Sequence, residues 1–432
     1  MNKIRKYIMI IFIFSILISS AFSSKAANVS WPNGPDISSA AGIVIDASTG
    51  TILYSKNCEE EHYPASITKL MTVLLVLENC SMDEVVTFSK NAVFGIEAGS
   101  SNIGINVGEK LTIEQCLYGI LLASANEVSY AVGEYVGDGD INKFVDMMNQ
   151  KAKDLGCKNT HFCNPHGLHN NDHYTCPYDM ALITKELLKY DTFRIISGSA
   201  RYVLPPTNLQ EESRYLNNTH KMLTNAAYYF DGVEGGKTGF TDQALNTLVT
   251  YAKRDNLEVI VVTMYGNQTH YSDTATLLNF VFDNFKSLNV SKNETVFSNS
   301  NNDFLENNNG FFNYLDSPII INNSDYIVLP IDADFSDANA SLSINNSNDG
   351  ASYLEYTYND IFIGRAEIKL AKNVHKTFDF NKKSSNWFTF RTLIAIIITL
   401  IIILILILII RKLYQKRKYK RRFITKKTNL KF

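Results

Sequence analysis

The hydrophobic pattern of the 432-residue chain alternates between strand-like and helix-like spacing. β-branched runs at 41–46 and 51–55, separated by the turn 47–50, indicate a β-hairpin. The apolar runs 247–252 and 257–264 indicate a second hairpin. Apolar residues at helical spacing predict helices over 64–77, 112–122, 127–136, 141–156, 178–188 and 272–285. Residues 112–115 have the pattern of a capping box at the start of the second of these helices.

A change of composition near residue 289 separates a second domain from the first. Residues 289–308 are rich in Asn and Ser, which is typical of a linker or a loop-rich start. Short β-branched runs follow between 311 and 378, without the spacing of a long helix. We therefore expect a small all-β domain over 288–378, and a larger first domain over 27–287.

The first 26 residues have the pattern of a secretory signal peptide. They begin with the basic residues Lys3, Arg5 and Lys6, continue with an apolar stretch, and end with small residues spaced as in a cleavage site. An uncleaved anchor is the alternative. We expect residues 1–26 to direct the chain out of the cytoplasm.

Residues 393–410 form an 18-residue segment in which Thr399 is the one polar residue. As a helix, this segment would be about 27 Å long, close to the hydrocarbon thickness of a bilayer. The tail 411–432 holds 11 Lys or Arg and no acidic residue, so the positive-inside rule predicts that it is cytoplasmic. We therefore expect a transmembrane helix at 393–410, reached through a linker at 379–392.

The exported part of the chain is strongly acidic, although the formal net charge is only −2. The signal region and the tail hold 15 of the 41 Lys and Arg, which leaves 26 basic against 43 acidic residues, a net charge near −17. An acidic body argues against a nucleic-acid partner. The basic tail is better explained by membrane topology and by contact with anionic lipid.

Six cysteines in a chain of this length are too few for a disulfide scaffold. Cys80 and Cys116 lie in apolar helical contexts, so we expect buried thiols there. Cysteines and histidines gather between 157 and 176, which keeps zinc open as a minor alternative. His169 and His173 are four residues apart, but no Cys-x-x-Cys or His-x-x-x-His group is clean, and we predict neither a metal nor another cofactor.

A nucleophile and a base occur together in the first predicted helix. Ser66 and Lys69 are three residues apart, so they lie side by side on a helix. A serine hydroxyl becomes a good nucleophile when a neighbour takes its proton, and a lysine can do so once burial or a second cation lowers its pKa. A capping serine beside a surface lysine is the alternative, and further motifs must decide between them.

Two such motifs follow. Ser124 and Asn126 lie in a short turn between predicted helices, where side chains can be directed into a cleft, although a plain interhelical turn has the same pattern. Lys237 and Thr238 are flanked by glycines, including Gly239, which let another backbone approach closely.

In chain order these groups read Ser66-x-x-Lys69, Ser124-x-Asn126 and Lys237-Thr238-Gly239. With the surrounding segments 64–72, 121–127, 159–168 and 235–241, the chain resembles the low-molecular-mass penicillin-binding proteins, which are serine-type D-alanyl-D-alanine carboxypeptidases. The resemblance is strong over 35–285, and the β domain and the C-terminal anchor fit the family's layout more loosely. It implies an α/β (α+β) fold of the β-lactamase/transpeptidase kind, with an antiparallel sheet flanked by helices.

The resemblance also implies a role for each residue. The substrates would be peptidoglycan stem peptides ending in D-Ala-D-Ala, and β-lactam antibiotics would acylate the enzyme. Ser66 would attack the carbonyl between the two D-alanines, Lys69 would be its general base, and Ser124 would relay a proton to the leaving D-alanine. The groups implied to bind substrate are Asn126 for an amide, Lys237 and Thr238 for the terminal carboxylate, Gly239 for strand contact, and the N–H groups of Ser66 and Phe240 for the oxyanion.

Two departures from the family's pattern affect these expectations. The middle motif reads Ser-Ala-Asn-Glu where Gly-Asn-Asp is commoner, but Ala125 is small and we expect activity to survive. Residues 243–246 replace the usual Ala-Gly pair, which is expected to alter rate or specificity.

Three other functions compete with the carboxypeptidase. A β-lactamase needs a carboxylate to activate its deacylating water, and 159–168 offers none. A non-catalytic penicillin-recognising sensor, or a structural wall-binding protein, is disfavoured because every catalytic side chain is present. Transpeptidation stays open, since it differs only in whether an amine or water takes the acyl group.

Overall fold

The computed structural model describes residues 29–294, 319–344, 352–370 and 411–412. The predicted signal peptide, linker and transmembrane segment, and nearly all of the tail, lie outside the described residues. Within the described part, none of the helices has the length and apolar character needed to cross a bilayer. The described residues up to Leu370 belong to one compact unit.

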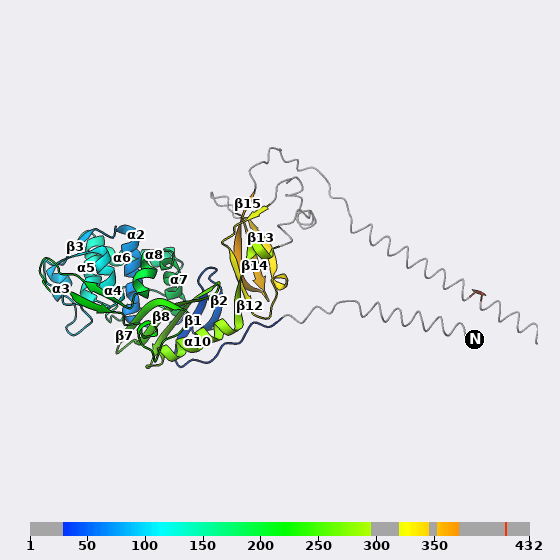
Figure 1. The fold of residues 1–432 in the computed structure, drawn as a ribbon, viewed down its shortest axis with the longest axis horizontal. Coiled ribbons are helices and arrows are strands. Elements are labelled where there is room, and N and C mark those ends of the chain that lie inside the picture. The colour runs from blue at the N-terminus through cyan, green and yellow to red at the C-terminus, as the bar shows by residue number, and fades with distance from the viewer. Residues whose placement is uncertain (1–28, 295–318, 345–351, 371–410, 413–432) are drawn as a thin grey trace, which may run out of the picture. The chain divides into compact units, whose positions relative to one another are not determined.

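A five-stranded antiparallel sheet forms the centre of the first domain, in the order β2-β1-β9-β8-β7 (Figure 1). Its strands are β1 (Ala41–Asp46), β2 (Ile52–Lys56), β7 (Val233–Thr241), β8 (Leu245–Arg254) and β9 (Leu257–Gly266). Both predicted hairpins are present, as β1–β2 and β8–β9. The two hairpins join because β1 pairs with β9, with Val44 opposite Val261.

Both faces of this sheet are covered at its centre, which explains why the strands β1 and β9 are mostly apolar and almost wholly buried. The helix α10 (His270–Asn284) covers one face, where Leu277 and Val281 pack with Val44 of β1. Ile43 and Ile45 of β1 point into the core on the other face. The helices on that side are α2 (Lys69–Asn79), α3 (Lys90–Phe94), α4 (Ile113–Leu121), α5 (Asn126–Val136), α6 (Ile141–Asp154), α7 (Pro177–Leu187) and α8 (Asp191–Gly198).

The first domain also contains a capping box and several short elements. The helix α4 begins with the predicted capping box, in which the Thr112 side chain accepts from Gln115 N and the Gln115 side chain accepts from Thr112 N. The remaining elements of this domain are β3 (Val85–Thr87) with β4 (Lys110–Thr112), β5 (Arg201–Leu204) with β6 (Arg214–Asn217), and α9 (Lys221–Thr224).

The first helix differs from its prediction. Ser66 lies in the 3-10 turn η1 (Ala65–Thr68), and α2 begins only at Lys69. Ala65 has a φ of +50°, a left-handed backbone that cannot continue a helix from Pro64. Ser66 and Lys69 still lie side by side, because residues three apart also align in a 3-10 turn.

A second core lies among the strands that follow α10. The strand β10 (Phe285–Asn289) and the short helix α11 (Val290–Asn293) lead to a four-stranded sheet in the order β11-β15-β14-β13. The strands of this sheet are β11 (Ile319–Ile321), β13 (Asn339–Ile344), β14 (Ser352–Tyr358) and β15 (Ile361–Leu370). The strand β12 (Tyr326–Pro330) pairs instead with β10. Within the described ranges 319–344 and 352–370, the one helical element beside these strands is the 3-10 turn η2 (Phe335–Asp337). The boundaries at 287 and 378 stay predictions.

All six cysteines lie in the described part, and each is a free thiol. Cys116 is fully buried as expected, whereas Cys80 is only partly buried.

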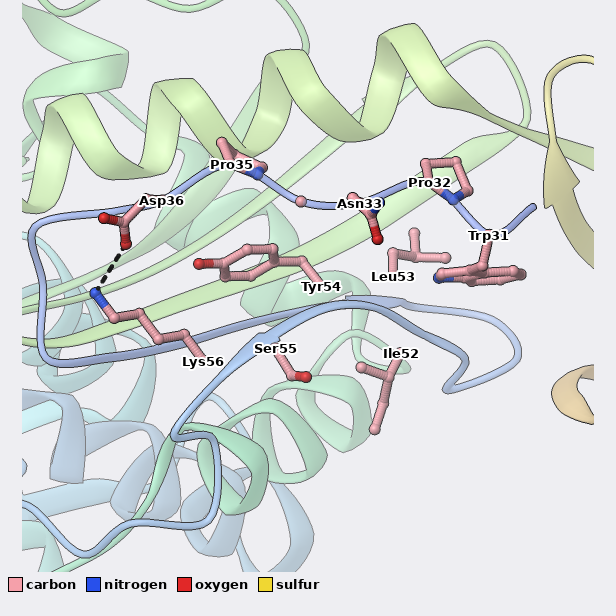
Figure 2. A pocket seen from close by; sticks show the side chains of 11 residues that line it. Trp31, Pro32, Asn33, Pro35, Asp36, Ile52, Leu53, Tyr54, Ser55 and Lys56 are labelled. Carbon is pink, nitrogen blue, oxygen red and sulfur yellow. Dashed lines mark hydrogen bonds and ion pairs between the residues drawn. The ribbon is translucent and has the colours of Figure 1, made fainter.

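A pocket of about 480 Å³ lies between residues 31–36 and β2 (Figure 2). Tyr54 of β2 points toward the 31–36 segment. Gly34 fits against the Tyr54 ring because it has no side chain, whereas a Cβ there would come within 2.2 Å of the ring. The segment is held by Lys56, whose Nζ lies 3.3 Å from the Asp36 carboxylate. No predicted site residue lines this pocket, so it is separate from the chemistry described next.

Candidate active site

The structure brings the three sequence motifs together from separate elements. Ser66 and Lys69 come from η1 and the start of α2, Ser124 and Asn126 from the corner between α4 and α5, and the third motif from the edge strand β7. Hydrogen bonds connect the first motif to the second and the second to the third.

The Lys69 amine is wholly buried and has three neighbours. Its Nζ lies 3.0 Å from Ser66 Oγ, 2.7 Å from Asn126 Oδ1 and 2.6 Å from the carbonyl oxygen of His166. The last two are acceptors, so they use both N–H groups of a neutral amine. When the amine is neutral, its lone pair is left to face the Ser66 hydroxyl, which is the arrangement that a general base needs.

The corner that holds Ser124 has a strained backbone. Ser124 has a φ of +59°, which is uncommon for a residue with a side chain, and it is only 6% exposed. Ala125 N donates to Gly119 O, and Asn126 N donates to Ser101 O, so the corner is fixed on both sides. Strain that surrounding contacts maintain is typical of functional sites.

Lys237 connects β7 to this corner. Its buried Nζ donates to Ser124 Oγ at 3.0 Å and to the carbonyl oxygen of Thr238 at 2.9 Å. Thr238 is half-buried, and Phe240 is 59% exposed beside it on the same edge strand. Lys237 therefore holds the Ser124 hydroxyl, two residues before the Asn126 that contacts Lys69.

The turn η1 is seated directly on the sheet. Thr247 Oγ1 of β8 donates to Pro64 O at 2.8 Å. A Cβ on Gly239 would come within 2.9 Å of Ser66 N and 3.1 Å of Pro64 O. Gly239 is therefore required here because β7 passes too close to the Ser66 backbone for any side chain.

The loop 159–168 supports the same turn from the other side. Gly167 has a φ of +85°, and a Cβ there would come within 1.9 Å of Ala65 O. Buried His173 accepts from Cys163 N through Nδ1, so its Nε2–H donates to Thr68 Oγ1 at 2.8 Å. Burial lowers the pKa of His173 to about 3, so this ring is neutral and structural.

The zinc alternative finds no support in this geometry. Both ring nitrogens of His173 are used in hydrogen bonds within the protein. Throughout the described ranges, no group of three His, Cys, Asp or Glu side chains is placed to hold a metal ion.

Comparison with known proteins decides the family. The family model described as D-alanyl-D-alanine carboxypeptidase matches residues 26–268, more than half of the chain. The chain belongs to the D-alanyl-D-alanine carboxypeptidase family.

Individual members of the family are similar over the same region. The D-alanyl-D-alanine carboxypeptidase DacF of Bacillus subtilis (strain 168) is 36% identical over 265 residues, which cover 59% of this chain and 65% of DacF. The D-alanyl-D-alanine carboxypeptidase of Streptomyces sp. (strain K15) is 30% identical over 261 residues, 57% of this chain and 88% of that protein. The solved Streptomyces K15 DD-transpeptidase structure superposes with a TM-score of 0.54 at 30% identity, covering 58% of this chain and 100% of that chain. The antiparallel sheet with flanking helices is thus the fold of this family.

Burial lowers the pKa of both lysines in the site, Lys69 and Lys237. Burial, and then the nearby Lys237 cation, hold the pKa of Lys69 well below its usual value of 10.5, while the Glu127 carboxylate acts in the opposite direction. Burial lowers the pKa of Lys237 to about 7. Lys69 is therefore neutral more readily than an ordinary lysine, as a base must be.

Two further residues contribute to the site, although the sequence analysis gave neither of them a role. Glu127 is buried directly after Asn126, and its Oε1 accepts from Ile103 N at 2.6 Å. Its Oε2 has no hydrogen-bond partner among the described residues, and burial raises the pKa of this carboxyl. His166 contributes through its main-chain carbonyl. Only the unusual acid at the end of the Ser-Ala-Asn-Glu motif could have drawn attention to Glu127.

The pKa of Lys237 predicts an alkaline limit to substrate binding. A protonated Lys237 favours an anionic substrate, and it loses its charge as the pH rises through about 7. We expect kcat/KM to fall above about pH 7 as Lys237 loses its charge. A bound carboxylate raises the pKa of Lys237, so the fall in kcat should come at higher pH than the fall in kcat/KM. The measurement is a pH profile of both parameters for the wild type and for Lys237→Arg, which stays charged. An alkaline limb near pH 7 that persists in Lys237→Arg would assign it to another group.

Proposed function

We propose that this chain is a serine-type D-alanyl-D-alanine carboxypeptidase that removes the terminal D-alanine from peptidoglycan stem peptides, and that it acts in building and remodelling the cell wall. The observation that carries the proposal is the Lys69 amine, buried within 3.0 Å of Ser66 Oγ while two acceptors occupy its N–H groups. Family membership gives the reaction class.

The first step is acylation of Ser66. Its Oγ attacks the carbonyl carbon between the two D-alanines, and its proton passes to Lys69 Nζ. The C–N bond of the tetrahedral intermediate then breaks, and the leaving D-alanine amine receives a proton through Ser124 Oγ. Lys237, 3.0 Å from that hydroxyl, keeps the relay in position.

The remaining residues hold the substrate in this reaction. Asn126 binds a substrate amide, and Lys237 and Thr238 bind the terminal carboxylate. The backbone N–H groups of Ser66 and Phe240 form the oxyanion hole. The close approach of Gly239 to Ser66 N supports this assignment, because it brings the β7 backbone beside the reacting serine.

Deacylation completes the cycle. Water attacks the ester carbonyl, Ser66 Oγ leaves and regains a proton, and the peptide departs one residue shorter. A β-lactam opens its ring on the same serine, which makes β-lactam antibiotics the expected covalent inhibitors.

We also propose that the catalytic domain acts outside the cell, anchored by a transmembrane helix at 393–410 with the tail 411–432 in the cytoplasm. The apolar span and the basic tail of the sequence support this topology. Degradation of the catalytic domain by protease added to intact wall-stripped cells tests the orientation, and full protection from that protease would reverse it.

Release of D-alanine tests the proposed reaction. The full-length protein is incubated with a peptide ending in D-Ala-D-Ala, with and without an added D-amino acid as acceptor. We expect stoichiometric D-alanine release by the wild type and by Ser81→Ala, an exposed control serine, and none by Ser66→Ala. Penicillin labelling without D-alanine release would indicate the sensor. If most of the acyl group is transferred to the added D-amino acid and not to water, the protein is a transpeptidase, which is how the similar solved structure is named.

A further inference from the structure

A second hydroxyl lies beside the third motif, on a residue that no motif includes. Thr219 Oγ1 is 2.9 Å from Thr238 Oγ1, and the Thr219 side chain is exposed. We propose that Thr219 is a binding residue for the terminal carboxylate of the substrate, paired with Thr238, and that it sets the preference for peptides ending in a free acid. This inference rests on the proposed function and extends its substrate site.

The fold uses both main-chain polar groups of Thr219 and leaves its hydroxyl available to a ligand. The Thr219 N–H donates to the carbonyl oxygen of Leu122, two residues before Ser124, at 3.1 Å. The Thr219 carbonyl oxygen accepts from the Tyr271 hydroxyl of α10 at 3.2 Å. Both main-chain groups are therefore used, one toward the active-site corner and one toward α10.

The neighbouring residues keep this position rigid. Asn218 is 7% exposed, and its Nδ2 donates to the carbonyl oxygens of Ser197 and Ser199, each at 2.9 Å. His220 is fully buried, with Nε2 2.9 Å from Thr250 Oγ1. An exposed hydroxyl between two buried, bonded neighbours is held in one place, which reduces the entropy lost when a ligand binds.

The chemistry of two adjacent hydroxyls favours an anion. Without a ligand, one of the two threonine hydroxyls must donate to the other, so one donor is spent inside the pair. A carboxylate accepts from both at once, through its two oxygens. Cations lie close by: the Lys237 amine is 2.9 Å from the Thr238 carbonyl, and Lys221 lies two residues from Thr219, over the Tyr271 ring. A neutral amide offers only one acceptor oxygen and gains little from these charges.

The test compares a peptide ending in D-Ala-D-Ala with the same peptide ending in a C-terminal carboxamide. Thr219→Val removes the hydroxyl and keeps the shape of the side chain. A hydrogen bond to a charged group corresponds to about a tenfold or larger change in binding. We therefore expect kcat/KM for the acid to fall about tenfold or more, mainly through KM, with little change for the carboxamide. Thr219→Ser should restore the acid preference, and Thr276→Val on the exposed face of α10 should leave both substrates unchanged.

The outcomes separate this inference from the proposed function. A Thr219→Val enzyme that loses activity on both peptides equally would show a structural role, and one with the wild-type acid-to-amide ratio would show no role, so either result overturns the inference alone. A wild type that releases no D-alanine from the acid overturns the proposed function, and this inference with it.

Discussion

Replacing Lys69 by Met is expected to lower the rate of Ser66 acylation by about 10²–10⁴-fold, the range that a positioned general base contributes. The methionine keeps the length and apolar character of the buried lysine stem but cannot take the Ser66 proton. No other titratable side chain in the described part hydrogen-bonds Ser66 Oγ. The measurement is the rate of covalent labelling by a fluorescent penicillin, followed together with D-alanine release.

Two controls keep that result interpretable. Lys90→Met changes an exposed lysine of α3 and should label at the wild-type rate. Because Asn126 Oδ1 and His166 O lose a donor in Lys69→Met, thermal unfolding must confirm that the variant is folded at the assay temperature. A folded Lys69→Met protein that labels within a few-fold of the wild-type rate would remove Lys69 from the role of base.

Gly167→Ala is expected to lower kcat by about 10²-fold, even though residue 167 makes no contact with substrate in the proposed mechanism. The added Cβ would come within 1.9 Å of Ala65 O and 2.9 Å of Thr68 Oγ1, so η1 must move. Ser66 lies inside that turn, and a displacement of about 1 Å at a reacting group is enough for a loss of this size. Steady-state kinetics of D-alanine release by the purified full-length protein provides the measurement.

Gly156→Ala is the matched control for this prediction. Gly156 has a φ of +84°, almost the same as the +85° of Gly167, but a Cβ there meets nothing within 4 Å. Gly156→Ala should lose about 1 kcal/mol of folding stability through left-handed backbone strain, and Gly167→Ala should lose more because its Cβ also displaces η1. Only Gly167→Ala should lose kcat. Equal losses of kcat in the two variants would mean that backbone strain, and not the position of η1, explains the effect.

The sequence predicted the parts of this molecule whose signal lies in side-chain type and spacing. The hairpins, the capping box at Thr112 and all three motifs belong to this class, because apolar periodicity and chemistry-bearing residues are visible in a single chain. The pairing of β1 with β9 was not predicted, since two runs of β-branched residues more than 200 positions apart carry no mark of being partners.

Other features of the site depend on backbone geometry that the residue letters do not show. Ala65 has a left-handed φ that converts the start of the first helix into a 3-10 turn, yet alanine is an ordinary helix residue. His166 contacts Lys69 through its carbonyl, which every residue possesses. Thr219 reaches Thr238 only because the chain folds back between Leu122 and α10.

The position of the covalent bond tests the central claim most directly. The full-length protein is acylated with penicillin, digested, and mapped by mass spectrometry. The account predicts one adduct, on the peptide containing Ser66, and neither adduct nor D-alanine release in Ser66→Ala. An adduct on Ser124 or any other residue, or D-alanine release that continues in Ser66→Ala, would contradict it.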